Sequence, residues 1–301
     1  MSFTPLSIFY AGNRSGVLHQ ILKEGHTVVK VASMPDSWLE KEMRQCPSID
    51  HFVATSKNSL VDHIENTDFD VFVSAGCYYI LPITKLKSKK RESIFVNIHP
   101  SFLPDLAGRD PIPAAILFRR DSGVTCHHMT DEIDKGPIIA QDKIKHTREL
   151  DSILLYKLCF SLEPKVFSTA IKKRFAANTA EMSQNNIYYT FSAGDNLYSL
   201  RDIYALDIIA RVNAFNTKSR LFKFQLDNTL YSVKYATIVD PVLQLVDRQT
   251  SDPWRILFTF ENNAIITNNI ECVRLHSISP SLNPTHDGRY LIVPDADYYA
   301  G

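Results

Sequence analysis

The sequence is poor in cysteine, and its cysteines form no pattern. The five stand at positions 46, 77, 126, 159 and 272 of 301 residues, without a Cys-x-x-Cys pair. An odd, scattered set is typical of small apolar side chains in a reducing compartment, so we expect neither a disulfide framework nor a zinc site. An excess of one charge is missing too. The 33 Lys and Arg residues balance 33 Asp and Glu residues, so no net field draws the chain to a nucleic acid.

A long hydrophobic run is also missing. The most apolar stretch, residues 71–83, includes the polar Ser74 and is shorter than the roughly 20 residues that span a bilayer. The first five residues, Met1 to Pro5, show neither the basic segment nor the apolar segment of a signal peptide. We therefore expect a cytoplasmic protein that makes no contact with a membrane.

Three common catalytic motifs are absent. After the first β-rich run, Gly12 and Gly16 have the wrong spacing for the Gly-x-Gly-x-x-Gly loop of dinucleotide-binding enzymes. Neither the phosphate-binding loop of nucleotide hydrolases nor the Gly-x-Ser-x-Gly turn of serine hydrolases occurs. His127 and His128 are neighbours, and on a strand they would point to opposite faces, so together they cannot chelate one metal.

Hydrophobic periodicity divides the chain into alternating strands and helices. Strands are predicted at 6–12, 27–33, the start of 69–82, 93–101, 124–130 and 136–144, and helices at 13–25, 59–66, 111–123 and 150–176. This alternation predicts an α/β fold with a Rossmann-like, mostly parallel sheet and helices on both faces. Ligands of such sheets bind at the carboxyl ends of the strands.

The composition changes after the predicted sheet. Residues 181–198 lie in a polar stretch that we interpret as a linker, so the first domain would cover 1–180. A helix is expected at 199–215, and short β-rich runs follow between 221 and 294. The segment 199–301 is therefore predicted to be a small β-rich C-terminal domain, a barrel or a sandwich.

One stretch, "VNIHPSFLPDLAGRDPIP" at 96–113, places polar side chains at the end of a buried strand. Asn97 and His99 share one face because strand side chains alternate, and Pro100 and Pro104 end the strand. A carboxamide can donate to a developing oxyanion, and an imidazole can exchange a proton near neutral pH. Such a pair suits chemistry at a carbonyl group.

The residues alone leave this interpretation open. A catalytic histidine needs a carboxylate to orient it, and Asp131, Glu132 and Asp134 offer three within the turn-like stretch "TDEIDKGPI". A polar pair at the end of a strand is nevertheless more often a loop cap than a catalytic pair.

The pattern around the pair resembles a known family. Asn-Ile-His-Pro-Ser-Phe-Leu-Pro at 97–104 is followed by Gly108, by Gly-Val-Thr at 123–125 and by Asp-Lys-Gly at 134–136. In order and spacing this is similar to the 10-formyltetrahydrofolate-dependent formyltransferases. The likeness is looser over residues 6–93 and returns faintly at 208–216, a segment similar to the start of the second domain in methionyl-tRNA and sugar formyltransferases.

The resemblance implies a catalytic trio and a donor. Asn97 would stabilise the oxyanion, His99 would carry protons, and Asp134 would orient the imidazole and favour its protonated form. The formyl donor would be 10-formyltetrahydrofolate, and no metal would be required. The segment 71–82 resembles the one whose backbone lines the pterin pocket.

The same resemblance assigns binding residues. Donor-binding residues would be Tyr79, Ile80, Leu81, Gly108 and Asp131. For Gly108 a plain turn glycine, and for Asp131 a solvated turn residue, are the alternatives.

Substrate-binding residues would be Ser101 and His127, and for His127 a core role is an equal alternative. Two departures from the family concern the acceptor and the folate fit. Ala107 stands where relatives with tRNA or sugar acceptors often carry Arg, and Tyr78-Tyr79 stand where many have Gly.

The possible functions differ in the molecule that accepts the formyl group. A nucleotide-activated amino sugar fits a neutral chain of this length best, with hydroxyornithine as a rival. A methionyl-tRNA acceptor is disfavoured because its phosphates call for a basic surface. Formyltetrahydrofolate hydrolysis and a non-catalytic binding role are the remaining alternatives. We also expect a homodimer in which the second domain helps to form the dimer or to close the acceptor cleft.

Overall fold

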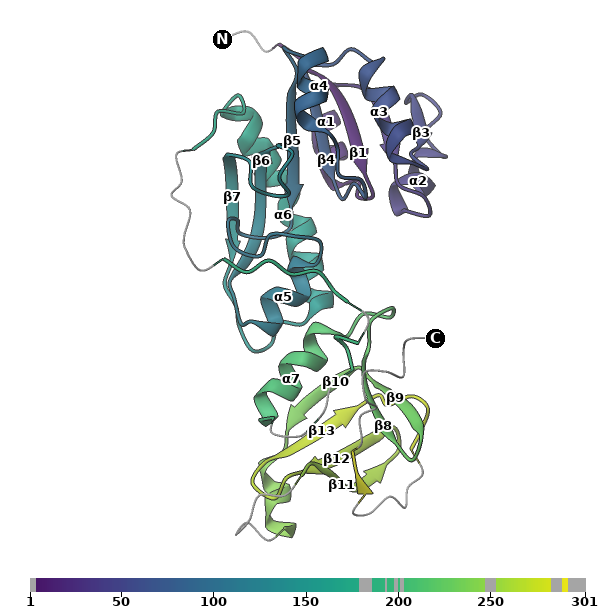
Figure 1. The fold of residues 1–301 in the computed structure, drawn as a ribbon, viewed down its shortest axis with the longest axis vertical. Coiled ribbons are helices and arrows are strands. Elements are labelled where there is room, and N and C mark those ends of the chain that lie inside the picture. Colours follow the sequence, from purple (N-terminus) through teal and green to yellow (C-terminus); the bar gives the residue numbers. More distant parts are fainter. Residues whose placement is uncertain are drawn as a thin grey trace. The chain divides into compact units, whose positions relative to one another are not determined.

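The structure is a computed structural model, which describes residues 4–178, 186–192, 194–197, 200, 203–246, 253–282 and 289–291 (Figure 1). The chain forms two compact units that alternate along the sequence. Apart from undescribed residues, the first unit comprises 1–111, 121–145 and 156–189, and the second comprises 112–120, 146–155 and 190–301. Of the predicted linker 181–198, residues 181–185, 193 and 198 lie outside the described part of the chain.

A seven-stranded sheet forms the centre of the first unit. Its strands are β1 (Ser7–Gly12), β2 (Thr27–Ser33), β3 (His51–Val53), β4 (Val71–Ala75), β5 (Ile94–His99), β6 (Ser122–His128) and β7 (Ile138–Ile144). They are ordered β3-β2-β1-β4-β5-β6-β7, the first five mutually parallel and the last two antiparallel to their neighbours. The predicted α/β fold with a mostly parallel sheet is confirmed.

Helices alternate with these strands and follow them in the chain. They are α1 (Gly16–Lys23), α2 (Trp38–Met43), α3 (Lys57–Glu65), α4 (Ile83–Lys89), α5 (Pro111–Leu117) and α6 (Ser152–Lys172). Local sequence explains where two of them begin. The hydroxyl of Ser37 accepts a hydrogen bond from the Glu40 N–H at the start of α2, and that of Ser56 accepts one from the Ser59 N–H at the start of α3.

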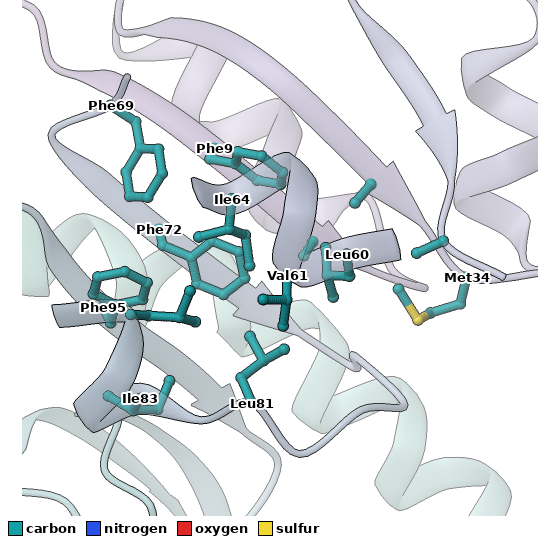
Figure 2. Packing of buried hydrophobic residues seen from close by; sticks show 14 residues of the cluster. Phe9, Met34, Leu60, Val61, Ile64, Phe69, Phe72, Leu81, Ile83 and Phe95 are labelled. Carbon is teal, nitrogen blue, oxygen red and sulfur yellow. The ribbon is translucent and has the colours of Figure 1, made fainter. Parts of the chain in front are cut away.

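One face of the sheet carries an aromatic core. Phe9, Phe72 and Phe95 come from three neighbouring strands, with ring centroids 5.5 Å apart from Phe9 to Phe72 and from Phe72 to Phe95. Figure 2 shows these rings packed against side chains of α3, among them Leu60 and Ile64. Because all five residues are buried, this cluster fixes which way every side chain of β5 points.

Other helices approach the opposite face. Tyr10 follows Phe9, so its side chain points away from the aromatic core, and its hydroxyl donates to the Arg14 carbonyl oxygen at 2.6 Å. Arg14 in turn pairs with Glu163 of α6, and a Cβ atom on Gly16 of α1 would lie 3.5 Å from Pro164 of α6. Helices therefore lie on both faces of the sheet, as predicted.

Several element boundaries differ from the prediction. Helix α5 ends at Leu117 instead of extending to 123, and β6 begins at Ser122. The difference has a local cause, because Arg119 adopts a left-handed φ of 51°, which cannot continue a right-handed helix. The short elements α2, β3 and α4 were not predicted from the sequence.

The second unit contains the β-rich part of the chain. After helix α7 (Ala205–Ala214), it holds β8 (Phe222–Leu226), β9 (Thr229–Val233), β10 (Tyr235–Ile238), the 3-10 helix η1 (Asp240–Leu245), β11 (Arg255–Phe260), β12 (Asn263–Thr267), β13 (Cys272–His276) and β14 (Arg289–Tyr290). These strands form an antiparallel sheet ordered β10-β13-β12-β11-β14 and a separate β8-β9 hairpin. Within the described part of the chain, no helix is long and apolar enough to cross a membrane.

Candidate active site

Strand β5 presents Asn97 and His99 on one face, at the carboxyl end of the parallel sheet. Phe95 lies in the aromatic core, and side chains repeat every second residue, so Asn97 and His99 follow it on the same side. The antiparallel partner β6 sets His127 opposite Asn97 and Thr125 opposite His99. The packing of one phenylalanine thus determines where the predicted pair points.

The carboxylate of Asp134 lies among these side chains. Its Oδ1 is 3.4 Å from Asn97 Nδ2, 3.6 Å from His99 Nδ1 and 3.5 Å from His127 Nε2. Asp134 follows β6 in the chain and adopts a left-handed φ of 55°, which Asp tolerates better than most residues. The structure therefore brings together the trio Asn97, His99 and Asp134 and adds His127 to it.

Glycines allow the backbone to approach at this site. The Gly108 N–H donates to Oδ2 of Asp134 at 3.0 Å, and Gly108 has a φ of 105°. A Cβ atom on Gly136, two residues after Asp134, would lie 1.7 Å from the carbonyl oxygen of His128. A side chain at 136 would therefore displace the turn that carries Asp134, which gives the Asp-x-Gly pattern a physical reason.

Hydrogen bonds define the orientation of His99. Its Nε2 lies 3.2 Å from the carbonyl oxygen of Leu106, an atom that can only accept, so Nε2 carries a proton. In the neutral ring, the unprotonated nitrogen is then Nδ1, on the side of Asp134. His99 is 6% exposed, so water contributes little to its surroundings.

Burial dominates the pKa of His99. It lowers the pKa below the usual 6.5 more strongly than the nearby Asp134 raises it, and His127 lowers it further. Asp134 thus favours the protonated form, the direction expected from the sequence, but desolvation of the ring outweighs the carboxylate. Burial alone would raise the pKa of Asp134, but His99, His127 and the Gly108 N–H together bring it to about 2. Before substrate binds, the His99 ring is therefore neutral and Asp134 is a carboxylate.

His127 belongs to the same cluster. Its Nδ1 lies 2.9 Å from the carbonyl oxygen of His128, and its Nε2 lies 3.2 Å from Nδ2 of Asn97. The neighbouring His128 points the other way, to the carbonyl oxygen of Phe175 at 2.9 Å, as strand alternation predicted. His127 is 2% exposed, so it contacts Asn97 and Asp134 from within the protein.

Two other predicted residues have internal partners. Ser101 is completely buried, and its hydroxyl donates to the carbonyl oxygen of Asp105 at 3.1 Å. The exposed Asp131 accepts a hydrogen bond from the Thr84 N–H at 3.1 Å and contacts the Thr84 hydroxyl, so it caps the start of α4. The structure thus gives both a structural role, and contact with a substrate or donor stays a prediction for each.

The predicted pterin segment, 71–82, contains β4, and the donor-binding residues named in it follow that strand. Tyr79 donates its hydroxyl proton to the carbonyl oxygen of Ala54 at 2.9 Å, Leu81 is buried in the aromatic core, and Ile80 is exposed. Among the described residues, no group of three His, Cys, Asp or Glu side chains is placed to hold a metal ion.

Two features next to His99 were not predicted from the sequence. One is the Leu106 carbonyl oxygen, a backbone atom for which side-chain patterns give no signal. The other is Arg14, whose guanidinium lies 3.1 Å from the Ile98 carbonyl oxygen and 2.9 Å from the carboxylate of the buried Glu163. Arg14 and Glu163 are 149 positions apart, so only the fold reveals that they meet.

Comparison with known proteins places the chain in a family. The profile of the formyl transferase family matches residues 11–171, more than half of the 301 residues. The chain therefore belongs to the formyl transferases, a family of enzymes that transfer formyl groups, and the resemblance inferred from the motif is confirmed.

Curated relatives are methionyl-tRNA formyltransferases. The protein from Listeria innocua is 28% identical over 136 residues, which cover 45% of this chain and 43% of the relative. The protein from Coprothermobacter proteolyticus is 26% identical over 197 residues, covering 61% and 60% respectively. The chain thus spans about half the length of these relatives.

Solved structures share the fold over most of the chain. WlaRD, a sugar 3N-formyl transferase solved in the presence of dTDP and 5-N-formyl-THF, has a TM-score of 0.68 and 19% identity, covering 93% of this chain and all of its own. An N-formyltransferase from Helicobacter canadensis in complex with folinic acid and dTDP-3-aminofucose has a TM-score of 0.67 and 18% identity, covering 91% and 99%.

Proposed function

We propose that this protein transfers the formyl group of 10-formyltetrahydrofolate to a primary amine of a nucleotide-linked amino sugar. The observation that carries the proposal is the convergence of Asn97 and His99 on Asp134, whose Oδ1 lies 3.4 Å from Asn97 Nδ2 and 3.6 Å from His99 Nδ1. A carboxamide donor, a neutral imidazole and a carboxylate are the groups that acyl transfer to an amine requires.

The chemistry of the site fits the donor. When bound, 10-formyltetrahydrofolate supplies a formyl carbon that is open to attack by an uncharged amine. The segment containing Tyr79, Ile80 and Leu81 would hold its pterin ring at the carboxyl end of β4, the edge of the sheet at which such folds bind ligands. Gly108 lies beside Asp134, to which its N–H donates.

His99 acts as the proton carrier. Its neutral Nδ1 accepts the proton that the attacking amine nitrogen loses, and the resulting imidazolium is stabilised by Asp134, 3.6 Å away. His99 then returns that proton to the departing nitrogen. The lowered pKa favours the first step because the resting ring is ready to accept, and the carboxylate supports the charge while it exists.

Asn97 stabilises the negative charge that develops on the formyl oxygen. Its amide nitrogen has two N–H groups, directed to His127 Nε2 at 3.2 Å and to Asp134 Oδ1 at 3.4 Å. The second contact is long for a hydrogen bond, so this N–H is the one that can turn to a substrate oxygen. A donor of this kind contributes about 3 kcal/mol to the stability of a transition state.

The choice of acceptor rests on the fold neighbours and on charge. The two solved structures were determined with a thymidine diphosphate or its amino sugar, and they cover more than nine-tenths of this chain. The chain carries no net charge, whereas binding to a tRNA backbone draws on clustered Lys and Arg. The curated relatives make methionyl-tRNA the second candidate.

The decisive experiment offers the protein 10-formyltetrahydrofolate with several amines. We would incubate it with dTDP-amino sugars, with methionyl-tRNA and with hydroxyornithine, and detect the formylated product by mass spectrometry. His99→Gln and Asn97→Ala serve as inactive controls that keep the fold. We expect formylation of a nucleotide amino sugar, lost in both variants.

Each other result changes the conclusion. Formylation of methionyl-tRNA alone would replace the acceptor, and release of formate without an amine would indicate a hydrolase. Turnover at the wild-type rate in His99→Gln would refute the mechanism. The expected homodimer and the cytoplasmic location stay predictions, and sedimentation analysis of the purified protein would test the first.

A further inference from the structure

A short segment far along the chain holds the loop that follows β5. The Tyr189 N–H donates to the carbonyl oxygen of Ala107 at 3.3 Å, and the Asp110 N–H donates to the Tyr189 carbonyl oxygen at 3.4 Å. The Ile187 N–H donates to Oδ1 of Asp105 at 2.8 Å. Residues 105–110 are thus fixed on one side by residues 187–189, while their other side reaches His99 and Asp134.

Asp105 connects these two sides. Its Oδ1 accepts the Ile187 N–H and also the N–H of Leu106 at 3.0 Å. Leu106 has a left-handed φ of 59°, which is unfavourable for a bulky side chain and persists only where surrounding contacts impose it. The carbonyl oxygen of this same Leu106 accepts the Nε2 proton of His99. One carboxylate oxygen therefore holds the residue that orients the imidazole.

We propose that Asp105 is a positioning residue that sets the tautomer of His99. By fixing Leu106 it keeps a carbonyl oxygen opposite Nε2, so the proton stays there and Nδ1 remains the nitrogen that can accept one. This inference rests on the proposed function, in which neutral His99 takes a proton from the amine.

The alternative tautomer explains why this matters. If the Leu106 carbonyl moved away, the proton of the neutral ring would favour Nδ1, where the Asp134 carboxylate lies 3.6 Å away. Nδ1, the nitrogen that takes the proton of the amine in the proposed mechanism, would then be a donor and could not accept that proton. Asp134 and Leu106 compete for the same proton, and Asp105 decides the outcome in favour of Leu106.

Two variants separate the effect of the hydrogen-bond-accepting oxygen of Asp105 from the effect of its charge. Asp105→Asn keeps an oxygen at the same position and loses the charge, and Asp105→Ala loses both. We expect kcat in Asp105→Asn to stay within about threefold of the wild type. In Asp105→Ala we expect kcat to fall roughly 10- to 100-fold with little change in KM, the size of effect that a misplaced catalytic group produces.

The tautomer is measured without any substrate. Nitrogen-15 NMR of histidine-labelled protein distinguishes a protonated from a bare ring nitrogen, and subtraction of the His99→Gln spectrum assigns His99 among the ten histidines. We expect a protonated Nε2 and a bare Nδ1 in the wild type and in Asp105→Asn, and a mixture or the reverse in Asp105→Ala.

The outcomes are distinguishable. An unchanged His99 tautomer in folded Asp105→Ala would overturn the proposal even if its activity fell. If the wild type formylates no amine but Asp105→Ala still changes the His99 tautomer, the proposed function is refuted and the positioning role of Asp105 stands. Should Asp105→Ala not fold, Asp105→Asn still decides, because a shifted tautomer there would assign the effect to charge and contradict the proposal.

Discussion

The backbone N–H of Gly108 lies 3.0 Å from Oδ2 of Asp134, and the opposite side of Gly108 faces Tyr188 and Tyr189. A Cβ atom at this position would lie 2.8 Å from the Tyr189 carbonyl oxygen and 3.1 Å from the Tyr188 ring. The glycine thus lies between the Asp134 carboxylate and a segment that supports the loop, with no space for a side chain on that side.

Gly108→Ala is therefore expected to reduce both stability and activity. The φ of 105° would be strained for alanine at a cost of about 1–3 kcal/mol, and the close contacts would displace the loop from Asp134. Urea unfolding measures the first effect and kcat the second.

Gly194→Ala is a matched control for this substitution. Gly194 has a nearly identical φ of 102°, but no described residue other than its chain neighbours lies within 4 Å of its Cβ position. Backbone strain should make this variant less stable as well, while its kcat stays at the wild-type value. If both variants had the same kcat, Gly108 would have no role in placing Asp134.

The pH dependence of the reaction follows from the lowered pKa of His99. In the proposed mechanism neutral His99 is the active form, so activity should be lost as the pH falls through the pKa of His99, which burial lowers below 6.5. Because the unfolded chain binds this proton more readily, His99 also contributes stability above pH 6.5 that is lost as the pH falls through the folded-state pKa. A pH profile of kcat/KM and an NMR titration of His99 measure the same midpoint.

Asp134→Asn tests the direction in which Asp134 shifts the pKa of His99. The carboxylate raises the pKa of His99 against the larger effect of burial, so its removal should lower the midpoint further. The remaining activity would be small, but its acidic limb, or the NMR titration, should shift to lower pH. A shift to higher pH would mean that Asp134 does not stabilise the imidazolium.

The strand pattern accounts for what the sequence predicted well. Asn97 and His99 stand two positions apart, and Phe95 stands two positions before Asn97, so period-two alternation was sufficient to place the pair on one face. The opposite orientations of His127 and His128 followed from the same rule. In each case the alternation of side chains along one strand was enough to predict where a side chain points.

Strand alternation could not predict contacts between segments that are far apart in the sequence. Neither the Leu106 carbonyl oxygen nor the segment at Ile187 carries a residue pattern that indicates contact with the site. The balance between burial and charge at His99 depends on the depth of the site, which alternation does not give. The family motif, rather than spacing, singled out Asp134 from its acidic neighbours.

The buried pair of Arg14 and Glu163 gives a prediction on stability. Glu163 is 1% exposed and holds the guanidinium that also contacts the Ile98 carbonyl oxygen, beside His99. Glu163→Gln would leave the positive charge of Arg14, whose side chain is only 14% exposed, without its partner, so we expect a loss of roughly 3–5 kcal/mol in the free energy of unfolding. Guanidinium titration followed by circular dichroism would measure it.

A surface pair of the same unit serves as comparison. Lys143 and Asp121 are 3.5 Å apart with about half of each side chain exposed, so Asp121→Asn should cost less than about 1 kcal/mol. Equal losses in the two variants would show that the burial of Glu163 does not matter.

The two explanations of Asp131 lead to different measurements. As a cap of α4, its carboxylate accepts hydrogen bonds from the hydroxyl and the N–H of Thr84, and these contacts, the hydroxyl first, hold its pKa below the usual range. Asp131→Ala should then lower the melting temperature and leave the KM for the folate donor unchanged. The neighbouring Glu132→Ala is the control, because Glu132 is exposed and pairs with Lys135 at 3.5 Å. A raised KM for the donor in Asp131→Ala, with an unchanged melting temperature, would instead support the donor-binding role that the resemblance implies.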